Sequence, residues 1–309
     1  MEWPPPLQRG DRIALVAPAR AISPEMIAPF LTFAEAQGWK VVYEPAVLFA
    51  QAGRFAGPDA LRQKALQEAL DAPNIRAIWC VRGGHGSTRL WPFLNWEKFR
   101  QFPKWLIGFS DITPLLWAAA YAGVVALHAP LASLVPHRVD PDALTQLLAI
   151  LQSSQMEYSL SWLRTPLQPW RPGCARGLLL GGNLSLLQTL CGTSLDLANW
   201  SEPPILFWEE VGEYLYRLDR MTWHLRNAMW YARSTALLIG DMRELLEEED
   251  APLGQTPQEI ILNALPEGLG CAGGLPVGHG RLNYPLPVGA WGQVEITETR
   301  AVLRVWRSD

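Results

Sequence analysis

The chain has 309 residues, of which 49% are hydrophobic and 18% charged, and its net charge is −4. This balance is typical of a folded globular protein and excludes a disordered chain. The weak negative charge gives no electrostatic reason to expect binding to nucleic acid or to an anionic membrane.

The first 130 residues alternate between predicted strands and predicted helices. Apolar runs predict buried strands at residues 12–19, 40–44, 75–81, 105–109 and 124–130. Ser23 and Pro24 are typical of a helix start, and residues 57–70 carry a helical apolar stripe. This alternation predicts an α/β fold, a doubly wound parallel sheet with helices on both faces.

Chemically useful residues follow several of these strands. Arg82, Gly83 and Gly84 come after the third strand, Ser110 after the fourth, and His128 ends the fifth. The carboxyl ends of parallel strands meet at one edge of a sheet, and ligands bind there. We therefore expect these residues to gather along one edge.

The second half of the chain has a different pattern. No regular periodicity runs from about residue 131 to residue 172, which we interpret as a connection. We then predict strands at 204–213 and 235–242, a helix at 216–230 and a hairpin over 293–306. The predicted domains are an α/β domain at 1–135, a connector at 136–172 and a smaller β-rich domain at 173–309.

The N-terminus and the cysteines favour a cytoplasmic location. The first twelve residues lack a basic segment followed by an apolar one, so we expect no signal peptide. No apolar run approaches the roughly 20 residues that a membrane span needs. The four cysteines show no Cys-x-x-Cys spacing, which predicts buried, reduced side chains and neither disulfides nor a zinc site.

The stretch WLIGFSDITPLL, residues 105–116, places Ser110 and Asp111 between a buried strand and a helical pattern. One interpretation is a helix cap, because serine and aspartate accept hydrogen bonds from the first turn. The other is a nucleophile on a tight strand-to-helix turn, next to N–H groups that hold an oxyanion. This stretch alone favours the helix cap, because such junctions are common, and leaves the nucleophile as the alternative.

A nucleophilic serine needs a histidine base, and that histidine needs a carboxylate to orient it. His279 lies in a loop rich in glycine and proline, and His85 lies in the glycine-rich RGGHG. The residues alone favour neither of the two. For the carboxylate, an apolar strand ends in Glu209 and Glu210, although a solvent-exposed strand end is the simpler interpretation for either residue alone.

Two glycine-rich turns are further candidates for binding. RGGHG, residues 82–86, matches neither common nucleotide motif, but its backbone suits close approach to a phosphate or to a substrate carbonyl. The turn at Gly181–Asn183 is similar, and its simpler interpretation is a tight corner between a strand and a helix.

Several motifs occur together in one order from about residue 12 to about residue 291. They are VAPAR, IWCVRGGHGSTRLWPFLNW, IGFSDITPLLWAAAYAGVVALHAP, GLLLGGNLSLLQTLCGTSLDL, PILFWEEVGEYLYRLDRM and LPVGHGRLNYPLPVGA. In these motifs the chain resembles the LD-carboxypeptidase family of serine peptidases. That family includes muramoyltetrapeptide carboxypeptidases of peptidoglycan recycling and microcin C self-immunity peptidases.

The resemblance implies a role for five residues. Ser110 is the nucleophile, His279 the general base and Glu209 the carboxylate that orients the base. The backbone N–H groups of Asp111 and Gly84 form the oxyanion hole. The implied reaction hydrolyses the amide between an L-centre, diaminopimelate or lysine, and a C-terminal D-alanine, without a metal or another cofactor.

The expected substrate site also includes Arg82, Gly83, His85 and Asn183. A carboxypeptidase must bind a free carboxylate, for which Arg82 and Arg89 are candidates, and a structural ion pair is the alternative for Arg82. The chain departs from the family at Ala19, where serine is usual, at His85, where tyrosine is usual, and in GTSLDL. These departures bear on which substrate is cleaved.

The resemblance further implies a homodimer whose partner is a small peptide, with no nucleic acid and no membrane bound. One alternative is a microcin-type peptidase that cleaves peptidyl or aminoacyl nucleotides. In that case Trp162 or Trp170 would stack on a base, although both also suit ordinary packing. The other alternative is a non-catalytic binding protein, since a fold does not fix a function.

Overall fold

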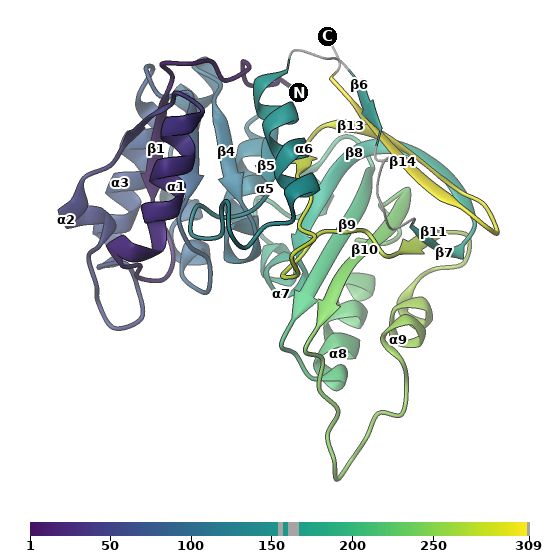
Figure 1. Cartoon of the computed structure of the whole chain (residues 1–309). Helices are drawn as coiled ribbons and strands as arrows, with labels where there is room; N and C mark the ends of the chain where they lie inside the picture. The colour runs from purple at the N-terminus through teal and green to yellow at the C-terminus, as the bar shows by residue number, and fades with distance from the viewer. Residues whose placement is uncertain (154–156, 160–166, 308–309) are drawn as a thin grey trace. The chain divides into compact units, whose positions relative to one another are not determined.

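The computed structural model describes residues 1–153, 157–159 and 167–307 of the chain. The chain forms two compact units (Figure 1). Unit 1 consists of Met1–Gln155 and Arg281–Gly289, and unit 2 consists of Met156–Gly280 and Ala290–Asp309. Each unit has its own sheet and its own core.

Unit 1 is built on a six-stranded sheet in the order β12-β5-β4-β3-β1-β2. Its strands are β1 (Arg12–Val16), β2 (Lys40–Val42), β3 (Ala77–Cys80), β4 (Trp105–Gly108), β5 (Ala126–His128) and β12 (Leu286–Val288). All neighbours are parallel except β12, which runs antiparallel to β5. The predicted parallel α/β sheet is confirmed.

The strand order reverses beside β1. The chain passes from β1 to β2 on one side and then returns to β3, β4 and β5 on the other. The connecting helices are α1 (Pro24–Ala36), α2 (Pro45–Leu48), α3 (Asp59–Asp71), α4 (Glu97–Gln101) and α5 (Thr113–Tyr121). The carboxyl ends of β1 and β3 therefore flank the point at which such sheets bind ligands.

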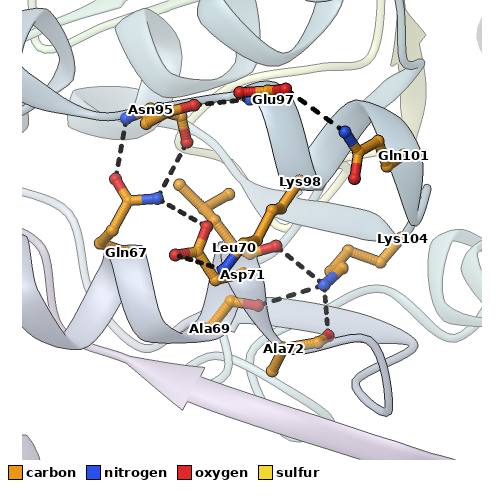
Figure 2. A network of polar contacts seen from close by, with 10 residues as sticks. All are labelled: Gln67, Ala69, Leu70, Asp71, Ala72, Asn95, Glu97, Lys98, Gln101 and Lys104. Atoms are coloured by element: carbon orange, nitrogen blue, oxygen red, sulfur yellow. Dashed lines mark hydrogen bonds and ion pairs between the residues drawn. The ribbon is translucent and has the colours of Figure 1, made fainter.

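The side chain of a buried lysine caps the C-terminal end of helix α3. Lys104 is fully buried and its ammonium donates to the carbonyls of Leu70 at 2.9 Å and of Ala72 at 2.5 Å, as Figure 2 shows. These carbonyls lie at the helix C-terminus, where no further turn supplies N–H partners and the helix dipole favours a cation.

Helix α6 is the longest of the helices that were not predicted from the sequence. It spans Pro141–Gln152, inside the predicted connector, where no regular periodicity was expected. The side chain of Asp140 caps it by accepting from the N–H of Asp142 at 2.9 Å, and Leu147 and Leu151 are buried. Aspartate followed by proline and a leucine stripe is the signal that could have identified it.

Unit 2 is built on an eight-stranded sheet in the order β6-β14-β13-β8-β9-β10-β11-β7. Its strands are β6 (Glu157–Ser159), β7 (Gln168–Arg171), β8 (Gly173–Asn183), β9 (Pro204–Val211), β10 (Ala236–Arg243), β11 (Gly270–Gly273), β13 (Trp291–Ile296) and β14 (Ala301–Trp306). The four central strands, β8 to β11, are parallel, and β13 with β14 forms the predicted hairpin. The helices are α7 (Leu184–Leu187), α8 (Leu215–Asn227) and α9 (Pro257–Ala264), and α8 contacts α9 (Figure 1).

A late segment of the chain joins unit 1. Strand β12 pairs with β5, with Leu286 opposite His128 and Val288 opposite Ala126. The domains predicted from the sequence are contiguous, whereas unit 1 also includes Arg281–Gly289 from late in the chain. The pairing joins residues far apart in the chain, and local periodicity carries no information about it.

Among the four cysteines, Cys80 and Cys271 are buried, Cys191 is half-buried and Cys174 is exposed, and all are free thiols. The prediction of burial is therefore wrong for Cys174, which lies near the start of β8. Within the described residues, every helix is too short or too polar to cross a membrane.

Candidate active site

Ser110 lies on a tight turn between β4 and α5. Its φ is 61°, in the left-handed region, and only two other described non-glycine residues, Met229 and Glu244, have positive φ. Helix α5 begins at Thr113 and its N-cap position is Ile112, so Ser110 does not cap that helix. A strained residue at a strand-to-helix turn favours the nucleophile interpretation, because such strain gathers at functional sites.

The glycine loop after β3 passes directly beside this turn. A Cβ atom built on Gly83 would lie 3.4 Å from the Cβ and 3.5 Å from the Oγ of Ser110, and 3.6 Å from the backbone nitrogen of Asp111. Gly84 follows with a φ of 110°, which glycine adopts without strain. The predicted oxyanion donors, the N–H groups of Asp111 and Gly84, therefore belong to two adjoining backbone segments.

Buried side chains tie these two segments together. The carboxylate of Asp111 accepts the Ser87 N–H at 3.0 Å, and the Ser87 hydroxyl donates to the Asp111 carbonyl. Burial raises the pKa of Asp111, against the opposing effect of these hydrogen bonds. From the other side, Arg62 donates to the carbonyls of Pro18 and Gly86. The loop geometry is thus fixed by contacts outside the loop itself.

Unit 2 brings together the predicted base and its carboxylate. Glu209, near the end of β9, is 0% exposed, and its Oε2 lies 2.7 Å from Nδ1 of His279. A proton on Nδ1 serves this contact and leaves Nε2 as the proton acceptor. Burial alone would lower the pKa of His279, but the hydrogen bond and charge of Glu209, helped by Glu210 and Asp241, raise it above its ordinary value.

Glu210 faces a different set of partners. Its carboxylate accepts from the Asn183 side chain at 3.0 Å and from the backbone N–H groups of Ser185 at 2.8 Å and Val211 at 2.9 Å. Burial, with a contribution from the charge of Glu209, raises the pKa of Glu210 to about 7. Both glutamates are buried, so the exposed strand end considered above is wrong.

The other predicted residues have clear environments. His85 is exposed and its ring lies 5.8 Å from that of Phe55 in unit 1, whereas the carboxylate partner of His279 is in unit 2. His128 is buried, with its ring 5.7 Å from that of Phe109. The contact with Glu209 identifies His279, and not His85, as the histidine with an orienting carboxylate.

The two candidate arginines differ. Arg89 forms an ion pair with Asp59 at 2.6 Å, and Arg62 shares the same carboxylate. Arg82 donates to the carbonyl of Ala21 at 2.9 Å. No ion pair to Arg82 is found among the described residues, so the structural ion pair considered for Arg82 is absent there.

Trp162 and Trp170 are the two tryptophans considered for stacking on a base, and the structure describes only Trp170. Trp170, on β7, packs its ring on Gly273, where a Cβ would lie 2.9 Å from the indole nitrogen. This contact is ordinary sheet packing. Trp162 lies outside the described residues.

Comparison with known families matches both parts of the chain. Residues 13–129 match the LD-carboxypeptidase N-terminal domain, and residues 176–294 match the LD-carboxypeptidase C-terminal domain. A putative carboxypeptidase of Synechocystis sp. is 32% identical over 94% of this chain and 94% of its own length. The murein tetrapeptide carboxypeptidase of Pseudomonas aeruginosa is 32% identical over 92% of this chain and 93% of its own length.

Solved structures share the fold. A muramoyltetrapeptide carboxypeptidase from Oxalobacter formigenes superposes with a TM-score of 0.81 at 23% identity, over 96% of this chain and 100% of that one. The microcin C7 self-immunity protein in complex with glutamyl sulfamoyl guanosine superposes with a TM-score of 0.83 at 18% identity, over 98% of both chains. These likenesses concern the fold alone.

Proposed function

Because the chain belongs to the LD-carboxypeptidase family and is a serine carboxypeptidase, we propose that its substrate is a murein tetrapeptide. The cleaved amide joins an L-centre, diaminopimelate or lysine, to a C-terminal D-alanine. The observation that carries the serine chemistry is the left-handed backbone of Ser110, whose hydroxyl lies beside Gly83 and near the backbone N–H of Asp111.

In the proposed mechanism, Oγ of Ser110 attacks the carbonyl carbon of the L-centre. Nε2 of His279 takes the serine proton and then gives it to the departing amine of D-alanine. Glu209 holds the imidazole in the required tautomer and stabilises its protonated form. The N–H groups of Asp111 and Gly84 hold the oxyanion, and loss of one such donor costs about 100- to 1000-fold in turnover. Water then attacks the acyl group while His279 takes its proton, and His279 returns that proton to Oγ of Ser110 as the acyl group leaves.

Two contacts support this assignment of roles. The hydrogen bond between His279 and the buried Glu209 supplies the base with its orienting carboxylate. The contacts of Asp111 and Arg62 hold the glycine loop against the Ser110 turn, as preorganised oxyanion donors require.

A second candidate substrate is a peptidyl or aminoacyl nucleotide. The microcin C7 self-immunity protein of Escherichia coli is 25% identical over 84% of this chain, which favours this candidate. Trp170, one of the two aromatic side chains that would stack on a base, packs its ring on Gly273, which gives it a structural role. The murein peptide remains the better supported substrate, since the relatives at 32% identity include a murein tetrapeptide carboxypeptidase.

The test compares two substrates on the purified protein. We expect release of D-alanine from a murein tetrapeptide at a kcat/KM well above that for cleavage of an aminoacyl sulfamoyl adenylate. The reverse preference would replace the first candidate with the second. Hydrolysis of neither, with no labelling of Ser110 by a fluorophosphonate, would favour the non-catalytic binding protein.

The cellular setting follows from this proposal. Tetrapeptides are products of cell-wall turnover, so we assign the protein to peptidoglycan recycling in the cytoplasm. The resemblance implies a homodimer, and sedimentation velocity would measure twice the chain mass of 34.5 kDa if the dimer forms. No metal or cofactor enters the proposed mechanism.

A further inference from the structure

Arg20 and Arg82 lie at the carboxyl ends of two neighbouring strands. Arg20 follows β1 by four residues and Arg82 follows β3 by two, and β1 pairs with β3 in parallel. The strand order of unit 1 reverses between these two strands. In open α/β sheets this is where ligands bind, so both arginines stand at a position suited to ligand contact.

The side chain of Arg20 packs directly on the glycine loop. A Cβ atom on Gly84 would collide with Cδ of Arg20 and lie 2.7 Å from its Cγ and 3.5 Å from its Nε. The aliphatic part of Arg20 therefore covers Gly84. The residue before Gly84 is Gly83, which adjoins the nucleophile Ser110.

The backbone of Arg20 is held on both sides. Its N–H donates to the carbonyl of Gly83 at 3.4 Å, and the residue pairs as an antiparallel bridge with Phe55. A fixed backbone limits where the guanidinium can reach and lowers the entropy lost when it binds a partner.

The two guanidinium groups have no anionic partner among the described residues, whereas Arg62 and Arg89 share Asp59. Arg82 uses one nitrogen for the carbonyl of Ala21. Burial lowers the pKa of Arg82, and the positive charge of Arg20 lowers it further. Two half-buried like charges are unfavourable together unless an anion joins them.

We infer that Arg20 and Arg82 form an anion site that binds the free carboxylate of the departing C-terminal residue. A guanidinium matches a carboxylate with two parallel hydrogen bonds, and two guanidinium groups can share both oxygens. The inference rests on the proposed function, and it names Arg20 as a determinant of specificity for a free C-terminus. Arg89, ion-paired with Asp59, has no part in this site.

The test uses two peptides that differ only at the terminus, one ending in D-alanine and the other in D-alaninamide. The variant is R20Q, and the matched control is R12Q, which removes the same charge from the amino end of the same strand. We expect R20Q to lower kcat/KM for the free acid about 10- to 100-fold, chiefly through KM, because hydrogen bonds to charged groups are worth about that factor. The amide substrate should change little, and R12Q should match the wild type on both.

A binding measurement separates this inference from the proposed function. In the S110A background the peptides stay intact, and calorimetry compares the Kd of acid and amide with and without R20Q. Loss of the preference for the acid in R20Q supports the anion site, even if the wild type hydrolyses neither peptide and the proposed function fails. Retention of that preference in R20Q, in both kinetics and binding, overturns the inference while leaving hydrolysis intact.

Discussion

Ser110 adopts a backbone conformation that glycine tolerates better than any residue with a Cβ atom, since its φ is 61°. We predict that the free energy of unfolding of S110G is about 1 kcal/mol higher than that of S110A. Both variants lack the hydroxyl, and only the glycine relieves the backbone strain. Urea denaturation of the two variants measures the difference. Equal stability, or a more stable alanine variant, would show that the turn stores no strain.

His279 gives the site its expected pH dependence. It must be neutral to accept a proton, and its pKa is raised above the ordinary 6.5 mainly by Glu209 acting against burial. We therefore predict that kcat/KM falls as the pH decreases, with a midpoint above 6.5. A pH profile of D-alanine release measures it, and a midpoint at or below 6.5 would contradict the assigned contact.

A nuclear magnetic resonance titration of His279 tests whether Glu209 is the cause of its raised pKa. In S110A the imidazole should titrate above 6.5, and in S110A combined with E209Q its midpoint should move downward. Removal of the carboxylate charge leaves burial as the dominant effect, and burial lowers the pKa of a histidine. An unchanged midpoint would mean that Glu209 does not act on His279 in solution.

At the scale of an element, helix α3 depends on one side chain from outside it. Lys104 satisfies carbonyls at the end of this helix, and the network around it appears in Figure 2. We predict that K104M lowers the free energy of unfolding by about 2 kcal/mol at pH 7, because buried carbonyls lose their donor. Q101A, which removes only an exposed contact with Glu97, is the matched control and should be nearly neutral.

The pH dependence of this effect has a defined sign. Burial lowers the pKa of Lys104 to about 8, whereas the unfolded chain keeps the proton up to about the ordinary 10.5. Between these values the unfolded state binds more protons, so this residue stabilises the fold increasingly as the pH rises. The difference between wild type and K104M should widen from pH 8 to pH 10.5, and a constant difference would contradict the lowered pKa.

Across the whole molecule, local patterns were sufficient for the α/β fold class and for several of the strands. Continuous apolar runs identified β1, β3 and β4, and strict alternation identified the hairpin of β13 and β14. Helix α6 has a capping aspartate, Asp140, followed by an apolar stripe, and this local signal is sufficient to predict it. The pairing of β12 with β5 carried no local signal, since it depends on a contact between distant segments.

Some residues of the candidate site could be predicted from local sequence patterns, and others could not. The turn at Ser110 and the loop at 82–86 follow from strand ends in a parallel sheet, and the structure brings these segments of unit 1 together. The pairing of His279 with Glu209, 70 residues apart, rested on the resemblance alone, because spacing along the chain left His85 equally plausible. Arg20 escaped notice, since a single arginine in a loop gives no signal until its contact with Gly84 is seen.

We propose that Ser110, His279 and Glu209 act together in one reaction. The most direct test of this proposal measures D-alanine release from a murein tetrapeptide by the wild type, S110A, H279N and the double variant. We predict that each single variant loses at least about 1000-fold in turnover and that the double variant is no worse, because residues that act as one unit are not additive. A folded S110A protein with wild-type turnover, or losses that multiply in the double variant, would contradict the account.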